Sequence, residues 1–163
     1  MQRHVCAGVA VAWVLAVALA LPSGEVKAMP FGLVDDGELE CLALNIYFEA
    51  RSEPSEGQLA VAYTTLNRVA DGKFPDSVCA VVQQGGEAKL HRCQFSWWCD
   101  GKSDKVSEMH AWQRSLLVAE RALRNRFSDP TGGALFYHST DVRPNWSQHF
   151  KLLARIGKHL FYR

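Results

Sequence analysis

The sequence lacks a charge imbalance, a low-complexity tract and any pair of cysteines at C-x-x-C spacing. Its 18 basic and 17 acidic residues nearly cancel, which argues against nucleic acid as a partner. No repeat and no linker rich in proline, serine or glycine divides residues 29–163, so a single domain is expected there. The missing cysteine pairs argue against a zinc site, and no metal or other cofactor is predicted.

One long apolar run, Val5–Leu21, stands near the N-terminus. A basic residue precedes it and small residues follow it, a pattern typical of a secretory signal peptide. Cleavage is predicted after Ala28, with a cut after Ala20 as the alternative. If the run were retained it would be a membrane anchor, since about 17 residues suffice to span a bilayer. We therefore expect a signal peptide at residues 1–28, and residues 29–163 to be exported to the periplasm or cell envelope.

Four cysteines follow the predicted signal peptide. An even number of cysteines in an exported chain predicts two disulfides. Of the three possible pairings, we expect Cys93 with Cys99, because the loop between them is short. The remaining pair, Cys41 with Cys79, would tie the first predicted helix to the third.

Apolar residues at helical spacing, bounded by capping and turn residues, predict four helices. They are expected at about residues 36–51, 54–70, 76–84 and 103–125. Asp36 is the expected N-cap of the first helix, and Ser103 or Asp104 that of the last. Five apolar residues of the last helix are expected in the core: Met109, Trp112, Leu116, Ala119 and Leu123.

The C-terminal part of the chain has the pattern of β-structure. A strand is predicted at Ala134–Ser139, and a hairpin at Leu152–Ile156 and His159–Tyr162, around Gly157–Lys158. Helices that come first and strands that follow predict an α+β fold, in which a helical bundle packs beside a small antiparallel sheet.

Glu49 stands in a helix that has almost no polar surface. Between Leu39 and Ala50, only Asn45 and Glu49 form a narrow polar strip, at i and i+4. A buried carboxylate without a partner costs several kcal/mol, so Glu49 must be paired, held protonated or placed at a cleft. A glutamic acid with a raised pKa is what a general acid needs near neutral pH. The alternative is a structural salt bridge, with Arg51 as the nearest cation.

Several sequence blocks follow one another in a recognisable order between residues 41 and 163. The blocks are Tyr47–Pro54 with Glu56–Gln58, Leu66–Val69, Gln94–Gly101, Asp129–His138 and Ala154–Gly157. Together they resemble the signature of the spore cortex-lytic, or SleB/CwlJ-type, cell wall hydrolases. The resemblance implies a lysozyme-related α+β fold, an enzyme that cuts the glycan strands of peptidoglycan, and Glu49 as its catalytic acid. Ser52 departs from the pattern, which commonly has glycine there, and would be strained if the backbone needed a positive φ.

Glycosidases usually employ two carboxylates, and the nearby candidates for the second are Glu53 and Glu56. A single glutamate suffices if the C6 hydroxyl of N-acetylmuramic acid is the nucleophile. The resemblance favours this reaction, a lytic transglycosylation of the β-1,4 bond between N-acetylmuramic acid and N-acetylglucosamine. A hydrolytic muramidase or glucosaminidase is the alternative.

Aromatic rings suit the apolar faces of sugars, and amides and hydroxyls suit sugar hydroxyls. The residues expected to bind saccharide on these grounds are Gln94, Ser96, Trp97, Trp98, Tyr137 and His138. One of the two tryptophans is instead expected in the core, and His138 has the alternative of a structural histidine. Arg143, Trp146 and His149 would extend the cleft from a nearby loop.

Two other classes of function compete with glycan cleavage. The first is a cysteine-dependent amidase of the wall peptides, with Cys41 as nucleophile and His138 as base. The second is a non-catalytic wall-binding module, which would gain stability by losing Glu49. Peptidoglycan is the expected ligand in each case, and no obligatory protein partner is inferred.

Overall fold

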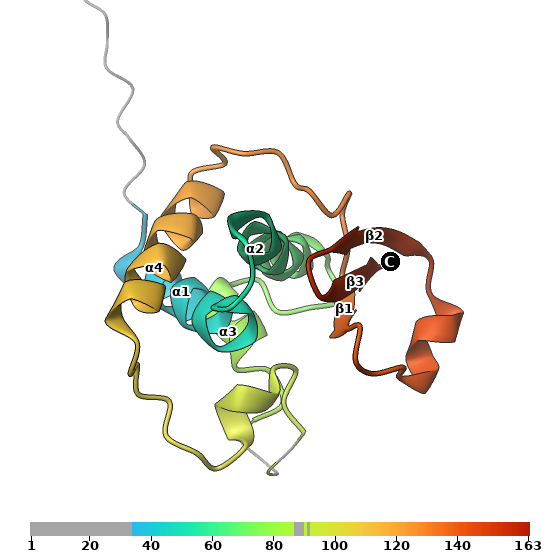
Figure 1. Cartoon of the computed structure of the whole chain (residues 1–163), viewed down its shortest axis with the longest axis horizontal. Helices are drawn as coiled ribbons and strands as arrows, with labels where there is room; N and C mark the ends of the chain where they lie inside the picture. The colour runs from blue at the N-terminus through green and yellow to red at the C-terminus, as the bar shows by residue number, and fades with distance from the viewer. Residues whose placement is uncertain (1–33, 87–89, 91) are drawn as a thin grey trace, which may run out of the picture. The chain divides into compact units, whose positions relative to one another are not determined.

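The structure, a computed structural model, describes residues 34–86, 90 and 92–163. The predicted signal peptide lies outside these residues. Two short 3₁₀-helices were not predicted, at Ser96–Cys99 and Asn145–His149. The α-helices are α1 (Asp36–Ala50), α2 (Ser55–Ala70), α3 (Val78–Val82) and α4 (Met109–Leu123), and the strands are β1 (Phe136–Ser139), β2 (Leu152–Ile156) and β3 (His159–Tyr162). The predicted α+β order of elements is confirmed, and Figure 1 shows the strands gathered beside α2.

Helix α1 begins one residue away from the predicted position. Its N-cap is Asp35 rather than Asp36, because Oδ1 of Asp35 accepts hydrogen bonds from the amides of Gly37 and Glu38 at 2.9 and 3.0 Å. Glu38 then caps another helix, since its carboxylate accepts from the amides of Val78 and Cys79 at the start of α3.

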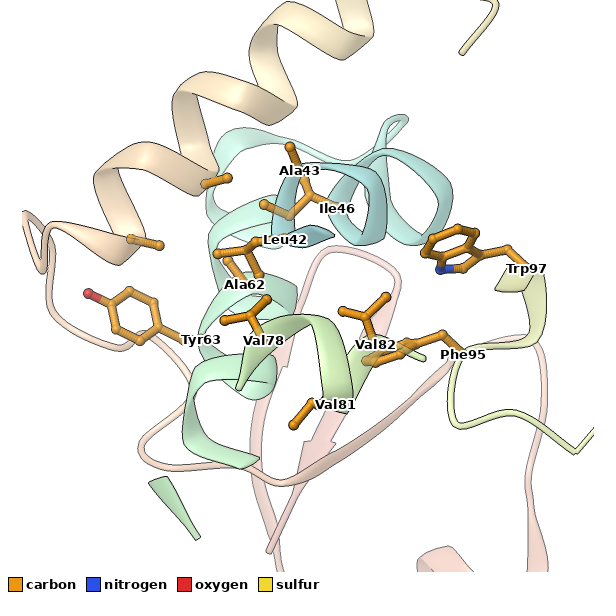
Figure 2. Packing of buried hydrophobic residues seen from close by; sticks show 12 residues of the cluster. Leu42, Ala43, Ile46, Ala62, Tyr63, Val78, Val81, Val82, Phe95 and Trp97 are labelled. Carbon is orange, nitrogen blue, oxygen red and sulfur yellow. The ribbon is translucent and has the colours of Figure 1, made fainter. Parts of the chain in front are cut away.

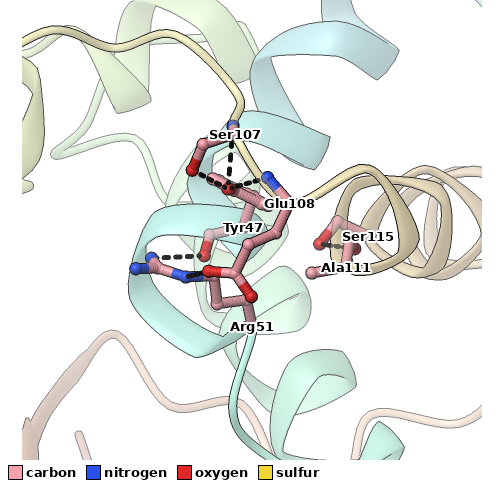
Figure 3. Close-up of polar contacts among 6 residues, drawn as sticks. All are labelled: Tyr47, Arg51, Ser107, Glu108, Ala111 and Ser115. Atoms are coloured by element: carbon pink, nitrogen blue, oxygen red, sulfur yellow. Dashed lines mark hydrogen bonds and ion pairs between the residues drawn. The ribbon is translucent and has the colours of Figure 1, made fainter.

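Helix α4 begins at Met109, well after the predicted caps Ser103 and Asp104. The delay has a tertiary cause, because the hydroxyl of Tyr47 accepts hydrogen bonds from the amides of Ser107 and Glu108, at 3.2 and 3.1 Å (Figure 3). These two residues are thereby tied to α1. Met109 is 59% exposed, so its predicted place in the core is wrong. Because α4 begins only at Met109, this residue lies in the first turn of the helix, where it faces solvent.

The sheet is antiparallel, with the strand order β1–β3–β2. The hairpin β2–β3 has the predicted bounds, and its turn holds Gly157 at a positive φ of 56°. Oε2 of Glu53 accepts a hydrogen bond from the amide of Lys158 at 3.0 Å, which anchors this turn to the segment between α1 and α2. Among the described residues only Asn125 has a positive φ without being glycine, so the strain considered for Ser52 is not present.

The main core lies among the four helices and is lined by aliphatic and aromatic side chains from α1, α2, α3 and α4 (Figure 2). A second, smaller cluster joins Ala60 of α2 to Phe161 of β3 and to Ala134, which precedes β1. Helix α2 thus contributes to both clusters, and it is the element that connects the helices to the sheet. In the described part of the chain, no helix has the length and apolar character needed to cross a membrane.

Both predicted disulfides are confirmed. Cys41 bonds to Cys79 with a Cα–Cα distance of 5.2 Å, and Cys93 bonds to Cys99 with a Cα–Cα distance of 6.0 Å. The first bond fastens α1 to α3. Because Cys41 is oxidised, it cannot serve as a thiolate nucleophile, and the alternative of a cysteine-dependent amidase is wrong.

Replacing Cys41 and Cys79 together by serine is expected to lower the free energy of unfolding by about 2–4 kcal/mol. The bond closes a loop with a sequence separation of 38, whereas the Cys93–Cys99 bond spans only 6. The entropy of the unfolded chain rises more when the longer loop is opened. Urea unfolding of both double variants measures the difference, and an equal loss in the two would contradict it.

Candidate active site

Glu49 lies in the last turn of α1 and is half-buried. Its Oε2 accepts a hydrogen bond of 2.9 Å from the hydroxyl of Tyr137 on β1. Burial raises the pKa of the Glu49 carboxyl above its usual range, while this hydrogen bond and the positive charge of Arg68 act in the opposite direction. Glu49 therefore keeps its proton to a higher pH than an exposed glutamate does, and its two partners limit this rise.

Arg51 does not pair with Glu49. Its Nε forms an ion pair with Oε1 of Glu108 at 2.9 Å, and its guanidinium lies 5.1 Å from the centre of the Tyr47 ring (Figure 3). This ion pair helps to hold the segment before α4 against α1. Arg51, which follows α1 directly, is therefore paired with Glu108, and the structural salt bridge considered between Glu49 and Arg51 is not formed.

The two residues of the polar strip of α1, Asn45 and Glu49, have different roles. Asn45 is fully buried, donates to Oγ1 of Thr65 at 3.1 Å and accepts from Nε1 of Trp97 at 3.0 Å. Its hydrogen-bonding groups are thus used inside the core. Glu49, one turn further, reaches the sheet instead.

Arg68 of α2 is a buried cation beside this pair, and it was not among the predicted site residues. It is 2% exposed, and its Nε donates to the carbonyl of Leu135 at 2.7 Å. Its guanidinium carbon lies 5.1 to 6.0 Å from the ring centres of three aromatic residues: Phe74, Phe95 and Phe136. Nη1 has no hydrogen-bond partner within the described part of the chain. Aromatic rings thus surround this guanidinium, and its positive charge favours the carboxylate form of Glu49.

Contacts within the sheet hold the side chain of Tyr137 in place. It faces Phe161 of β3, its partner in the register, and its ring also meets the ring of His159 edge-on at 5.4 Å. Burial and the nearby Glu49 carboxyl raise the pKa of the Tyr137 phenol well above its usual value. Tyr137 therefore remains a hydrogen-bond donor to Glu49 across the neutral range.

A cavity of about 350 Å³ reaches Tyr137 and Arg68, the two partners of Glu49, although Glu49 itself does not line it. It is lined by Arg68, Gln94, Phe136, Tyr137, Trp146 and Phe150. Among the predicted saccharide-binding residues, Gln94 and Tyr137 therefore share one cavity. The aromatic walls of the cavity are suited to stacking against sugar rings.

The other predicted saccharide-binding residues lie elsewhere. Trp97 is 7% exposed and stacks on Phe48 at 4.6 Å, so its ring belongs to the core, as expected for one of the two tryptophans. Trp98 is half-buried and packs against the same core, while Ser96 is exposed. None of the three lines the cavity beside Tyr137.

His138 points away from Glu49, because neighbouring residues of a strand face opposite sides of the sheet. It is 8% exposed, and its Nε2 lies 3.0 Å from the hydroxyl of Tyr162 and its Nδ1 2.8 Å from the carbonyl of Ser139. Both ring nitrogens therefore have hydrogen-bonding partners. This is the arrangement of a structural histidine, which was the alternative to a role in the cleft.

The two carboxylates considered as partners of Glu49 have different surroundings. Glu53 is 8% exposed, and its Oε2 is engaged by the amide of Lys158 in the hairpin turn. Glu56 is exposed in the first turn of α2. The hydrogen bond of Glu53 and the position of Glu56 have structural explanations that require no catalytic role.

Comparison with known proteins adds to this geometry. A family model described as Cell Wall Hydrolase matches residues 52–162, a range that begins just after Glu49. The spore cortex-lytic enzyme of Halalkalibacterium halodurans is 33% identical over 127 residues, which make up 77% of this chain and 34% of that protein. The spore cortex-lytic enzyme of Bacillus subtilis is 31% identical over 136 residues, 82% of this chain and 39% of that protein. The chain thus spans between about a third and a half of the length of the curated relatives it matches.

Two solved structures are similar over most of the chain. The catalytic domain of the germination-specific lytic transglycosylase SleB from Bacillus anthracis is 29% identical, with a TM-score of 0.61, and the match covers 81% of this chain and 98% of that one. The catalytic domain of the Bacillus cereus SleB protein is 27% identical, with a TM-score of 0.60, and the match covers 84% of this chain and 99% of that one. These matches confirm the predicted lysozyme-related α+β fold.

Proposed function

The chain belongs to the cell wall hydrolase family, and from that premise we propose that it cleaves the glycan strands of peptidoglycan as a lytic transglycosylase. The bond cut is the β-1,4 link between N-acetylmuramic acid and N-acetylglucosamine, and Glu49 is the single catalytic glutamate. The observation that carries the proposal is the half-buried Glu49 carboxyl, which meets the neutral hydroxyl of Tyr137 at 2.9 Å.

The reaction begins with proton transfer from Glu49 to the glycosidic oxygen. The bond from that oxygen to C1 of N-acetylmuramic acid breaks, and the leaving sugar departs with a new hydroxyl group. Glu49 is then a carboxylate in a site that disfavours its charge. Tyr137 donates a hydrogen bond to this carboxylate, and the positive charge of Arg68 stabilises it.

The second half of the reaction returns the proton. The Glu49 carboxylate takes the proton of the C6 hydroxyl, whose oxygen attacks C1 of the same sugar. The product is a 1,6-anhydromuramic acid end, and no water is consumed. Glu49 regains its proton and is ready for the next cleavage. One carboxyl group therefore acts first as acid and then as base.

The proposed saccharide site is the cavity lined by Tyr137, the hydrogen-bond partner of Glu49. Gln94 supplies an amide for sugar hydroxyls, and Tyr137, Trp146 and Phe136 supply aromatic surface. Trp97 is left to the core, and Ser96, Trp98 and His138 lie outside this cavity.

We also propose that the protein works outside the cytoplasm, in the periplasm or cell envelope. Peptidoglycan lies there, and the two disulfides fit an oxidising compartment.

Digestion of purified glycan strands in heavy-oxygen water is expected to leave the new muramic acid ends without label, since the attacking oxygen comes from the substrate. Mass spectrometry should find ends that are one water lighter than reducing ends. Label at most of the new ends would mean that water is the nucleophile. The enzyme would then be a hydrolytic muramidase or glucosaminidase with a second carboxylate, such as Glu53 or Glu56.

A further inference from the structure

A second cavity, of about 370 Å³, lies on the other face of β1 from Glu49. His138 and Tyr162 form its floor on the sheet, and the segment between β1 and β2 forms much of its wall. The mechanism uses none of these residues. We call it the outer cavity.

The outer cavity adjoins the cavity that Tyr137 lines. Phe150 lines both of them. The ring of Trp146 connects the same two regions, since its centre lies 5.9 Å from that of Phe136 and 5.4 Å from that of His138. Phe150 and Trp146 thus lie between the two cavities, and a group attached to a sugar in the first has only these rings to pass on its way to the second.

The linings of the two cavities differ in chemistry. The first offers mainly aromatic surface, which suits sugar rings. The outer cavity adds the aliphatic side chains of Val142, Leu152 and Leu160, together with hydrogen-bonding groups such as Gln148. Aliphatic contacts that alternate with hydrogen-bonding groups suit a short peptide, whose methyl groups and amides alternate in the same way.

Arg143 gives the outer cavity its positive charge. It is exposed, and no carboxylate among the described residues forms an ion pair with it. Asp141 is the acid in the same segment, but its Oδ2 accepts from Oγ of Ser139 at 3.2 Å and it does not line the cavity. A guanidinium in this position is available to a carboxylate of a ligand.

We propose that the outer cavity binds the peptide that N-acetylmuramic acid carries in peptidoglycan, with Arg143 meeting a carboxylate of that peptide. The inference rests on the proposed function, because the peptide arrives attached to the sugar held beside Glu49. It makes glycan that bears peptides the preferred substrate, over strands from which the peptides have been removed.

The test compares KM for peptide-bearing glycan and for the same strands stripped of peptide by an amidase. The unmodified protein is expected to show a KM about fivefold lower for the peptide-bearing strands, in keeping with one exposed charge pair. In Arg143→Gln, the KM for stripped strands divided by the KM for peptide-bearing strands should fall toward one. Arg114→Gln, which removes an exposed arginine of α4 outside both cavities, should leave the ratio unchanged.

The outcomes separate this inference from the proposed function. If neither substrate is cut, the proposed function fails. If both are cut with equal KM by the unmodified protein, the peptide site is wrong. A rise of KM for both substrates in Arg143→Gln would make the outer cavity a saccharide site and overturn the inference.

Binding of the free peptide gives a readout that does not depend on cleavage. The free peptidoglycan tetrapeptide, without muramic acid, titrated into Glu49→Gln protein, is expected to shift the NMR amide signals of Thr140 and Gln148. The shifts should be lost in the double variant that adds Arg143→Gln. Shifts that persist without Arg143 would contradict the assigned carboxylate contact.

Discussion

Replacing Glu49 by glutamine is expected to lower turnover on glycan strands at least about 10²-fold, while the fold survives. Glutamine keeps the shape of the side chain and accepts the hydrogen bond from Tyr137, but it has no proton to give. Release of soluble muropeptides, followed by chromatography, measures the effect. The matched control is Glu40→Gln, an exposed glutamate on the same helix, which should retain full activity. Near-normal turnover in Glu49→Gln would rule Glu49 out as the general acid.

The same substitution has an expected effect on stability. The pKa of Glu49 is raised by burial, so the folded state holds its proton to a higher pH than the unfolded chain does. Between the two pKa values the unfolded chain binds fewer protons, and stability therefore falls as pH rises above the usual glutamate range, near about 4.3. Glu49→Gln abolishes this loss. Its free energy of unfolding at pH 7 should equal or exceed that of the unmodified protein.

Replacing Arg68 by methionine is expected to lower kcat/KM about 10²-fold, the scale of removing one preorganised electrostatic contact. The reason is the carboxylate that Glu49 becomes after it has protonated the leaving sugar, which loses the nearby positive charge. Methionine fills space among the rings of Phe74, Phe95 and Phe136, so that the loss of packing is small.

The pH profile distinguishes this role from a structural one. Arg68 favours the charged form of Glu49, so its removal raises the pKa of Glu49 further. A general acid works only while it is protonated, and the alkaline limb of kcat/KM should therefore move to higher pH in Arg68→Met. Arg68→Lys keeps the charge and should restore the limb toward its original position. An unchanged limb in a correctly folded Arg68→Met protein would show that Arg68 serves packing alone.

The sequence by itself determined most of the local structure and the identity of the main candidate. Spacings of three to four residues and of two residues record which face of an element is buried. The hairpin 152–162 and the helices, apart from the start of α4, were therefore predictable within a few residues. The parity of the cysteines and the short Cys93–Cys99 loop gave the disulfides. Glu49 was noticeable because a carboxylate in an almost wholly apolar helix needs an explanation.

Only the tertiary structure decided which residues surround Glu49. Arg68 stands in a helix pattern like any other arginine, and its burial depends on three phenylalanines from separate segments. The late start of α4 likewise depends on a hydroxyl of Tyr47 that is about sixty positions away in sequence. Trp97 and His138 have side chains that suit a cleft, yet packing places one in the core and the other on the far face of β1. Periodicity records only how a segment faces its nearest layer, whereas the partner across that layer is set by the packing of the whole chain.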